Sequence, residues 1–343
     1  MSERAVVFRA PHDVGVLPYV ERSLGPGEVR LQTLYSGISA GTELTVYRGT
    51  NPYLNRNWDA HRRLFTDGST FEYPLHGWGY EQVGEIAEVG EGVTRLRVGD
   101  RVWGIWGHRS SAVLAEDVVA DRVLDGVPPM CGIFARIGAV ALNAVLDADI
   151  HVGEIVAVFG QGVPGLIATQ LARLNGGDVI AVDRVSRRLE LAASFGARPI
   201  DASVAGAAQA IKDTTGGRGA DVTIELTGSA GALHEAIRGA AYGSRVVVAG
   251  FAQGGAGDLR LGEEFHHNRI ELVSSQIGGV HPRLSHRWDV MRLERTILDL
   301  RTQDRLELEP LVTRIEPLER APYVFQLLDE RPEDEVQVVL EFG

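Results

Sequence analysis

Apolar and polar positions follow two different rhythms along the chain. Between residues 128 and 276, short apolar runs alternate with amphipathic stretches, which is typical of strands buried on both faces and joined by helices. The apolar runs predict strands at 155–159, 179–182, 222–226, 245–249 and 270–273. The stretches between them predict helices around 186–195, 203–212 and 231–241. We therefore expect an α/β fold with a doubly wound parallel sheet.

Residues 1–126 have a different pattern. Short alternating segments, such as 29–34 and 83–89, are separated by many glycines and frequent turns. Alternation with a period of two and closely spaced turns favour an antiparallel β domain.

The C-terminal part contains a helical stretch, an amphipathic piece and a terminal strand, at 289–301, 317–328 and 335–341. A chain of 343 residues is long for one hydrophobic core, so more than one domain is expected. The predicted division is a β domain, a parallel-sheet domain and a return of the chain to the first domain, at 1–126, 127–276 and 277–343.

A glycine-rich turn follows the apolar run 155–159 directly: Gly160, Gln161, Gly162, Val163, Pro164 and Gly165. The first glycine allows the tight turn, the second lets a pyrophosphate approach the backbone, and the third lets helix and strand pack closely. Backbone N–H groups of the helix that follows would face the phosphates. Pro164 fits the first helical turn, where its missing N–H has no intrahelical partner to lose. The sequence therefore predicts a dinucleotide site.

The next strand of this motif ends at Asp183, 23 residues after Gly160. An acid at this position can accept both ribose hydroxyls of NAD and would repel the 2′-phosphate of NADP. Arg184 could contact that phosphate instead, so we expect NAD as the cofactor, with NADP as the alternative. Further cofactor-binding candidates are Arg188, Thr227, Gly250, Ser275, Gln276 and Ile277.

Composition excludes several classes of protein. The formal net charge of −12, without a basic cluster, argues against nucleic-acid binding. No apolar run is expected to reach the roughly 18 residues that a membrane span needs, and residues 1–30 lack a signal-peptide pattern, so we expect a cytoplasmic protein without a membrane partner. Cys131 is the only cysteine and Lys212 the only lysine, which excludes an intrachain disulfide and disfavours lysine-based catalysis.

Three further segments resemble the medium-chain dehydrogenase/reductase superfamily, the zinc alcohol and polyol dehydrogenases. Segment 79–102 is similar to the GHE-x-x-G-x-V-x-x-VG…GDRV signature, segment 36–43 to the SGIC-x-(S/T)D segment with one residue inserted, and segment 136–145 to EPLAVALHAV. The resemblance covers nearly the whole chain. It implies a GroES-like catalytic domain, a Rossmann domain and a homodimer or homotetramer that acts on a small-molecule substrate.

The resemblance ends at the metal. The positions that carry the family's catalytic zinc ligands hold Ser39, Tyr80 and Arg136 in this chain. Neutral hydroxyls are poor zinc ligands, and an arginine repels a cation. The loop that carries four structural cysteines in many relatives is also absent. We therefore expect no zinc.

An alcohol that loses hydride also sheds its O–H proton, so the site needs a base and a cationic or donor group. Arg136 supplies the permanent positive charge, and beside it Tyr80 is expected to have a lowered pKa and to pass the proton. Thr42 would extend the relay, while Glu81 and Glu43 would orient the arginine. The alternative is a buried Arg136–Glu81 ion pair with another acid/base. The catalytic candidates are therefore Thr42, Glu43, Tyr80, Glu81, His108 and Arg136.

These residues favour a zinc-independent, NAD-linked dehydrogenase that oxidises a secondary alcohol. A sugar, polyol or cyclitol suits the five tryptophans, which could stack on a polyhydroxylated ring; they are Trp58, Trp78, Trp103, Trp106 and Trp288. A zinc-free NAD(P)H quinone or enoyl reductase is an alternative, which Asp183 disfavours. An inactive nucleotide-binding protein is a third possibility.

Overall fold

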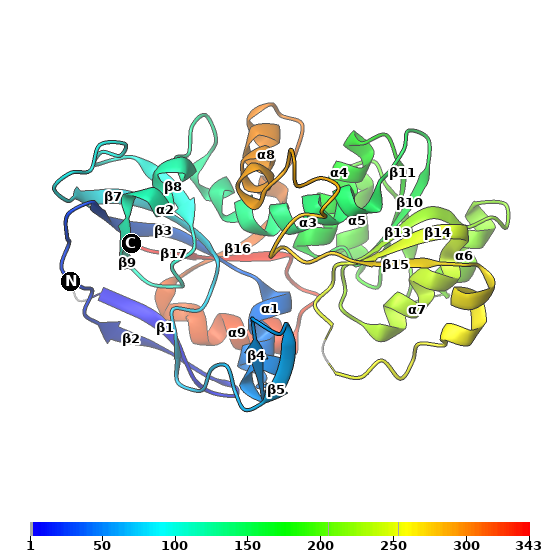
Figure 1. Ribbon diagram of the computed structural model, residues 1–343, viewed down its shortest axis with the longest axis horizontal. Coiled ribbons are helices and arrows are strands. Elements are labelled where there is room, and N and C mark those ends of the chain that lie inside the picture. The colour runs from blue at the N-terminus through cyan, green and yellow to red at the C-terminus, as the bar shows by residue number, and fades with distance from the viewer. Residues whose placement is uncertain (1–2, 205, 253) are drawn as a thin grey trace. The chain divides into compact units, whose positions relative to one another are not determined.

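The contacts of the chain divide it into two units. Unit 1 consists of Met1–Arg136 together with Leu308–Gly343, and unit 2 is Ile137–Glu307. The computed structural model (Figure 1) describes every residue except 1–2, 205 and 253. The division differs from the sequence-based boundaries, because residues 127–136 belong to unit 1 and residues 277–307 to unit 2. The return of the chain to the first unit therefore begins at Leu308.

Unit 2 is built on a six-stranded parallel sheet in the order β12-β11-β10-β13-β14-β15. This is the order of a doubly wound dinucleotide-binding sheet, with the first strand of the motif at the centre. The predicted fold of this part is confirmed. The strands are β10 (Ile155–Phe159), β11 (Asp178–Asp183), β12 (Arg198–Asp201), β13 (Ala220–Glu225), β14 (Ala240–Val248) and β15 (Glu271–Ser274).

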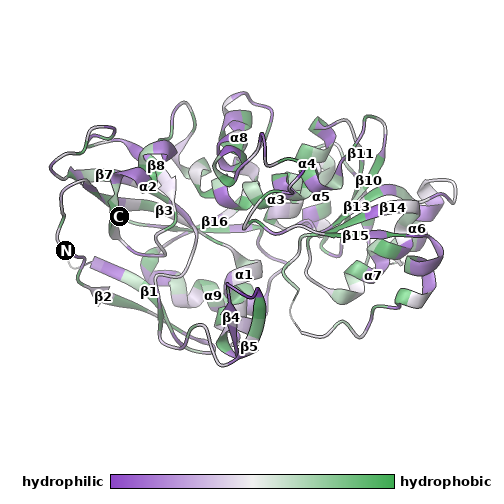
Figure 2. Cartoon of the chain, viewed as in Figure 1, coloured by the Kyte–Doolittle hydropathy of each residue, from purple (hydrophilic) through white to green (hydrophobic). Residues whose placement is uncertain are grey.

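Helices connect these strands. They are α4 (Val163–Leu174), α5 (Ser186–Ser194), α6 (Ala207–Thr214) and α7 (Ala230–Gly239), and α8 (Val290–Thr302) follows the last strand. One core packs β10 and β11 against α6 and α7, with Phe159, Ile211 and Ile237 almost fully buried. Figure 2 shows the hydrophobic residues along the central strands. The apolar runs of the sequence thus became central strands because both of their faces are covered.

Unit 1 is largely antiparallel, as the alternating pattern predicted. Its main sheet has the order β16-β17-β3-β7-β8, with β9 also paired to β3. Beside it are a three-stranded sheet, β2-β1-β6, and a hairpin, β4-β5. The strands are β1 (Glu3–Ala10), β2 (Asp13–Tyr19), β3 (Glu28–Ile38), β4 (Arg56–Asp59), β5 (Leu64–Asp67), β6 (Leu75–His76), β7 (Glu81–Val89), β8 (Arg101–Gly104), β9 (Ser111–Ala115), β16 (Val312–Pro317) and β17 (Gln337–Glu341).

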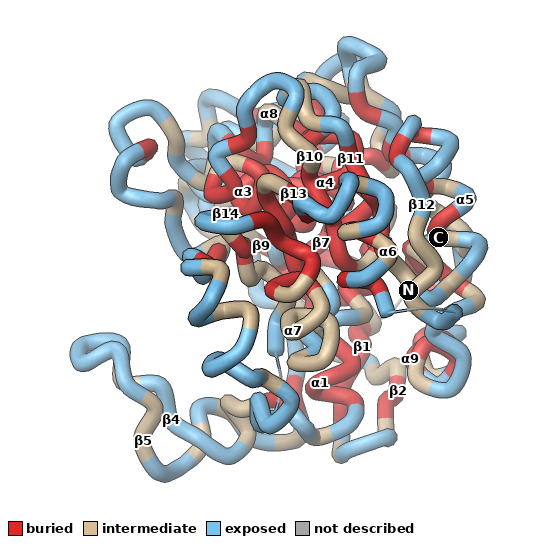
Figure 3. The backbone as a smooth tube through the Cα atoms, turned by 90° about the vertical axis from the view of Figure 1, so that its right-hand side faces the viewer, coloured by how far each residue is buried: buried red, intermediate tan, exposed pale blue. Residues whose placement is uncertain are grey.

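The C-terminal strand closes unit 1, because β17 pairs antiparallel with β3 and parallel with β16. In the described part of unit 1, the helices that lie wholly within it are α1 (Ala40–Tyr47), α2 (Glu116–Val119) and α9 (Ala321–Glu330). Phe8 of β1 and Phe325 of α9 meet edge to face in the core, 4.9 Å between ring centroids. Figure 3 shows β1 and β7 as buried and the β4-β5 hairpin as largely exposed. One-turn segments lie at Pro52–Leu54, Ala120–Arg122, Pro129–Ile133, Leu261–Phe265, Glu309–Leu311 and Leu318–Arg320.

One apolar stretch has the length of a membrane span, although no run of this length was expected from the sequence. Pro129–Ala148, which includes α3 (Phe134–Ala148), has 20 residues, and its most apolar 18 residues have a mean hydropathy of 1.6. Of its most apolar part, 72% is buried inside the protein. Core helices show the same combination of length and burial, so the stretch is weak evidence for a membrane segment.

Candidate functional site

The glycine turn of unit 2 gives each glycine the position that the motif requires. Gly160 has φ +87°, and a β-carbon on it would lie 2.7 Å from Thr227 Cγ2. A β-carbon on Gly165 would overlap with the Gly160 carbonyl oxygen, so helix and strand approach too closely for any side chain. A β-carbon on Gly162 would meet nothing within 4 Å. The open position is therefore the middle glycine, where the motif lets a pyrophosphate approach.

Helix α4 begins directly after this open position. Gly162 is its N-cap and has no side chain that could cap the helix. Pro164 lies in the first turn. The first intrahelical bond runs from the Leu166 N–H to the Gly162 carbonyl oxygen. The N–H groups before it are oriented along the helix axis without intrahelical partners, which is the arrangement that binds phosphate.

Asp183 ends β11 beside this turn. Its Oδ2 accepts a hydrogen bond from the Gln161 backbone N–H at 2.5 Å. Its Oδ1 accepts from the backbone N–H groups of Arg184 and Val185 at 2.7 and 2.9 Å. The carboxylate is thus held by three backbone donors and retains acceptor capacity for a ribose hydroxyl. Arg184 is exposed and Arg188 is half-buried in α5.

Sequence reasoning missed Glu225, a buried acid at the end of β13. Its Oε1 accepts from the Thr227 backbone N–H at 2.6 Å and from Gly228 at 3.1 Å. Burial raises the pKa of this carboxyl above its usual range. A β-carbon on Gly250 would overlap with the Gly228 nitrogen. Glu225 therefore holds the turn that brings Thr227 and Gly250 together next to Gly160.

The last cofactor candidates follow β15. The Ser275 N–H donates to the Val248 carbonyl oxygen at 2.9 Å, and the Ser275 hydroxyl accepts from Asn143 Nδ2 at 3.2 Å. Gln276 is exposed, and its side chain accepts from the Gly278 N–H at 2.6 Å. Ile277 is half-buried in the turn that follows Gln276. These residues stand at the carboxyl edge of the parallel sheet, where ligands bind in this class of fold.

In unit 1, three hydroxyl groups form a hydrogen-bonded chain. Ser39 precedes α1, Thr42 lies in its first turn, and Tyr80 directly precedes β7. The Ser39 hydroxyl forms a short hydrogen bond with the Tyr80 hydroxyl, and Thr42 Oγ1 lies 3.3 Å from the same phenol oxygen. The side chains at two of the three positions that match the family's zinc ligands are thus hydrogen-bonded to each other.

The predicted lowering of the Tyr80 pKa is wrong. Burial raises the pKa of this phenol well above its ordinary value, and the adjacent Glu81 carboxyl raises it further. The hydrogen bonds from Ser39 and Thr42 oppose this shift but are smaller effects. Tyr80 is therefore a neutral phenol at physiological pH, because burial outweighs the hydrogen bonds.

Glu81 lies deeper than its role as an orienting group would suggest. The side chain is 1% exposed, and neither carboxylate oxygen makes a well-formed hydrogen bond with a described residue, although the nearby Ser39 and Gln337 side chains act to lower its pKa. Burial raises the pKa of Glu81 well above its usual range, and the nearby Glu43 carboxyl adds to the shift. A carboxyl group that is buried near a second carboxyl stays protonated to a higher pH than an exposed carboxyl group.

Glu43 also has a different partner from the one expected. Its Oε2 lies 2.6 Å from His108 Nε2, and both side chains are fully buried. Its Oε1 accepts the Ser39 backbone N–H at 2.9 Å. Glu43 therefore orients His108 and the start of α1. Arg136 lies half-buried in α3, and its place beside Tyr80 stays a prediction.

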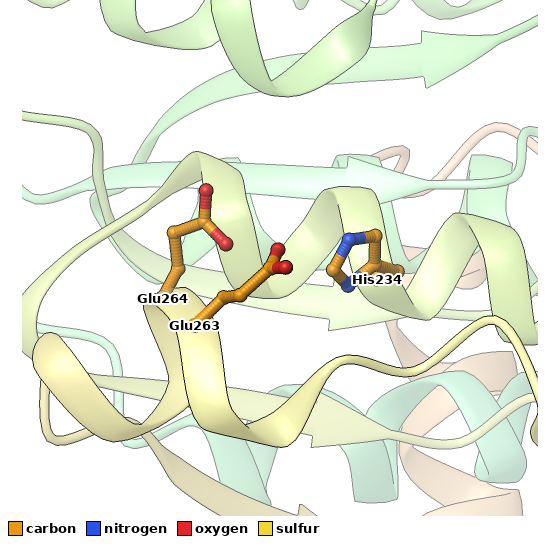
Figure 4. Close-up of side chains that lie close together, drawn as sticks. All are labelled: His234, Glu263 and Glu264. Atoms are coloured by element: carbon orange, nitrogen blue, oxygen red, sulfur yellow. The ribbon is translucent and has the colours of Figure 1, made fainter.

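Among the described residues, one group of three side chains has the composition of a metal site (Figure 4). It contains His234 of α7 with Glu263 and Glu264, whose candidate ligand atoms lie within 4.8 Å of one another. Arg238 Nε donates to Glu264 at 3.3 Å, so a cation already compensates this carboxylate. The nearby His266 and His267 lie in a helical turn.

Comparison with known protein families gives two matches. Residues 25–157 match the alcohol dehydrogenase GroES-like domain, and residues 164–292 match the zinc-binding dehydrogenase domain. A curated relative, D-guloside 3-dehydrogenase of Escherichia coli (strain K12), is 30% identical over 99% of this chain and 100% of its own length.

Solved structures share the fold over the whole chain. The 2R,3R-butanediol dehydrogenase of Bacillus subtilis has a TM-score of 0.80 at 22% identity, covering 99% of each chain. A protein of Sinorhizobium meliloti 1021 that is described as a zinc-binding dehydrogenase, bound to NADP, has a TM-score of 0.79 at 21% identity over 99% of each chain. An alcohol dehydrogenase of Escherichia coli CFT073, in complex with NADH, has 0.78 at 20% identity over 100% of each. Either cofactor thus occurs on this fold.

Proposed function

Since the chain belongs to the medium-chain dehydrogenase/reductase superfamily, as an NAD(P)-dependent oxidoreductase of the alcohol and polyol dehydrogenase type, we propose that it oxidises a secondary alcohol without zinc. The observation that carries this proposal is the hydrogen bond between Ser39 and Tyr80, at two positions where relatives hold the metal. The proposed substrates are sugars, polyols or cyclitols, with glycosides favoured by the relative named D-guloside 3-dehydrogenase.

Zinc does not fit the side chains at these positions. Protein zinc ligands are deprotonated thiolates, neutral imidazoles or carboxylates. The Ser39 and Tyr80 oxygens are bonded to each other, and the raised pKa of Tyr80 disfavours the phenolate that could ligate. The third position holds Arg136, which stays protonated and repels a divalent cation. No step of the proposed reaction therefore passes through zinc.

NAD(P) fits the residues of unit 2. The bound nicotinamide would accept the hydride that leaves the carbinol carbon of the alcohol. The α4 N-terminus and Gly162 would hold the pyrophosphate, and Asp183 the adenosine ribose, which supports NAD as the preferred form. Ser275, Gln276 and Ile277 are proposed to contact the cofactor at the edge of the sheet.

The alcohol proton would leave through the hydroxyl chain of unit 1. A neutral Tyr80 cannot take this proton as a phenolate base, so it must pass its own proton on as it receives one. Thr42 Oγ1, at 3.3 Å from the phenol oxygen, is the next group, and Thr42 is only half-buried. The proton can therefore move from the alcohol through Tyr80 and Thr42 to water.

Arg136 is proposed to stabilise the negative charge that develops on the alcohol oxygen. In zinc-dependent chemistry the metal does this by lowering the pKa of a bound hydroxyl. A guanidinium supplies a permanent positive charge and several directed donors in its place.

A continuous row of aromatic side chains supports a sugar as the substrate. Trp58 of the exposed β4-β5 hairpin packs on Phe65 at 4.9 Å between ring centroids, and the row continues through Tyr53 and Phe71 to Trp78 with spacings of 5.4, 5.7 and 5.1 Å. Trp78 is two residues before Tyr80. Trp58 remains 37% exposed. A rigidly supported, accessible indole is a suitable surface for the apolar face of a sugar ring.

Purified protein should be screened with methyl glycosides, polyols and cyclitols, with NAD and NADP in parallel, by following NADH or NADPH absorbance. We expect oxidation of at least one secondary alcohol of this class, with NAD preferred. Reduction of quinones or enones, without alcohol oxidation, would contradict the proposal. We also propose that the protein is cytoplasmic and forms a homodimer or homotetramer. Native mass determination would test the oligomeric state.

A further inference from the structure

An acid–histidine pair lies buried beneath the hydroxyl chain of unit 1. We propose that Glu43 and His108 form a positioning pair that holds Ser39, Thr42 and Tyr80 at the distances needed for proton transfer. This inference rests on the proposed alcohol oxidation. It assigns His108 a role beneath the site, since its ring is buried and cannot touch a substrate.

Both ring nitrogens of His108 are occupied. Nε2 lies 2.6 Å from Glu43 Oε2, and Nδ1 lies 2.7 Å from the Ser36 hydroxyl. His108 is 1% exposed and Ser36 and Glu43 are fully buried. A ring with both nitrogens engaged in the interior has no free position for general acid/base work on a substrate. Its fixed orientation makes it suitable as a support.

The hydrogen bonds around Ser36 are compatible with a His108 proton on Nε2. The Trp106 and Gly107 backbone N–H groups donate to Gln82 Oε1 at 3.0 and 3.3 Å. The other end of this amide, Nε2, therefore donates to Ser36 Oγ at 3.0 Å. With its oxygen accepting from Gln82, the Ser36 hydroxyl can donate to Nδ1. When Glu43 is ionised, Nε2 then carries the proton and donates it to the carboxylate.

Glu43 connects this pair to the first hydroxyl-bearing segment. Its second oxygen accepts the backbone N–H of Ser39, the N-cap of α1. A glutamate that reaches back to the N-cap N–H fixes the start of a helix, as in a capping box. Both Ser39 and Thr42 are therefore placed by the carboxylate that His108 orients.

His108 connects the pair to the second hydroxyl-bearing segment. Gly79, which precedes Tyr80, has φ +107°, and a β-carbon on it would lie 2.6 Å from His108 Nε2. The His108 backbone N–H also donates to the Trp78 carbonyl oxygen at 2.9 Å. The imidazole thus packs directly under the backbone that carries Tyr80. One buried pair supports both ends of the Ser39–Tyr80 hydrogen bond.

Three variants test this role, each compared with wild type for kcat, KM, NADH affinity and thermal stability. His108→Leu removes both ring contacts, Glu43→Gln removes the charge but keeps the shape, and Gly79→Ala pushes a methyl group against the imidazole. His12→Asn is the matched control, because His12 is an exposed histidine of the same unit, 3.5 Å from Asp329. We expect kcat to fall about 100-fold in His108→Leu, since a displacement of about 1 Å can cost that factor. KM and the NADH dissociation constant should change less than about threefold.

A spectroscopic measurement separates positioning from simple packing. Nitrogen-15 NMR of labelled protein, with His108 assigned by its loss in His108→Leu, should show Nε2 protonated in the wild type. In Glu43→Gln the side-chain amide donates to Nε2, so the proton should move to Nδ1. Retention of the wild-type tautomer in Glu43→Gln would overturn the proposed pair.

The outcomes distinguish this inference from the proposed function. A folded His108→Leu protein with kcat within about threefold of wild type overturns the positioning role and leaves the alcohol oxidation intact. Loss of NADH affinity together with kcat, in a His108→Leu protein that keeps the thermal stability of a folded chain, also overturns it. If His108→Leu does not fold, kcat of Glu43→Gln and Gly79→Ala decides by the same criterion. A wild type that binds NADH but oxidises no alcohol contradicts the proposed function, and the tautomer switch still tests the pair.

Discussion

The Asp183 carboxylate accepts a hydrogen bond from the Gln161 backbone N–H at 2.5 Å. This contact joins the end of β11 to the glycine turn that follows β10. The acid of the dinucleotide motif is thereby fixed next to the turn before any cofactor arrives. Pre-organisation of this kind lowers the entropy that binding must offset.

Asp183 should determine the preference between the two cofactors. In Asp183→Ser, the ribose contacts and the repulsion of a 2′-phosphate are both lost, so the NAD/NADP preference should shrink by about tenfold or more, equivalent to about 1.4 kcal/mol. Titration of NADH and NADPH by fluorescence measures this ratio. Wild-type protein that already prefers NADPH would show that Arg184 outweighs Asp183.

Two alanine substitutions in the glycine turn should affect different properties of the protein, cofactor affinity in one case and stability in the other. The β-carbon of Gly162→Ala enters open space, so this variant should keep the wild-type thermal stability and lose NADH affinity by at least about tenfold. The β-carbon of Gly165→Ala overlaps with the Gly160 carbonyl oxygen and should destabilise the protein by about 1–3 kcal/mol. Thermal unfolding and NADH titration of both variants check this. Equal affinity of Gly162→Ala and wild type would remove the middle glycine from the phosphate site.

Tyr80 and Arg136 should be needed for turnover and not for cofactor binding. Tyr80→Phe removes the relay hydroxyl and should lower kcat about 100-fold or more. Arg136→Met removes the proposed positive charge and should have an effect of similar size. NADH affinity, which depends on unit 2, serves as the control. If both variants fold and keep most of their kcat, the cluster is structural, and the acid/base must be sought among exposed histidines such as His76 and His286.

Glu81 should make the stability of the protein depend on pH. Its pKa is raised in the folded state, so between the unfolded pKa near 4.5 and the folded pKa the native state binds more protons than the unfolded state. Stability should therefore fall as pH rises through this window, by up to about 1.4 kcal/mol per pH unit. Glu81→Gln cannot ionise and should flatten this slope in denaturant unfolding measured at several pH values.

The control for this measurement is Glu88→Gln, because Glu88 lies on the same strand with its side chain 57% exposed. It should retain the wild-type slope. An identical pH dependence in Glu81→Gln and wild type would contradict the burial of a protonated acid.

The parallel-sheet unit and its glycine turn could be predicted from the sequence because their signals are local. Buried strands read as apolar runs, and each glycine of 160–165 has a steric function that its spacing reveals. The Glu43–His108 pair joins residues 65 positions apart, so no local pattern reports it. The predicted direction of the Tyr80 pKa shift was wrong, because the shift depends on burial and a sequence does not show how deeply a phenol is buried. The unit boundary at Glu307 likewise follows from three-dimensional contacts.

Zinc content measured on the same sample as turnover tests the central claim most directly. Elemental analysis of purified protein, assayed with and without a strong chelator, should give well below one zinc per chain and a rate of alcohol oxidation that the chelator does not change. The reason is the side chains present at the ligand positions, Ser39, Tyr80 and Arg136. One tightly bound zinc per chain, with alcohol oxidation lost on its removal and restored on its return, would contradict the account.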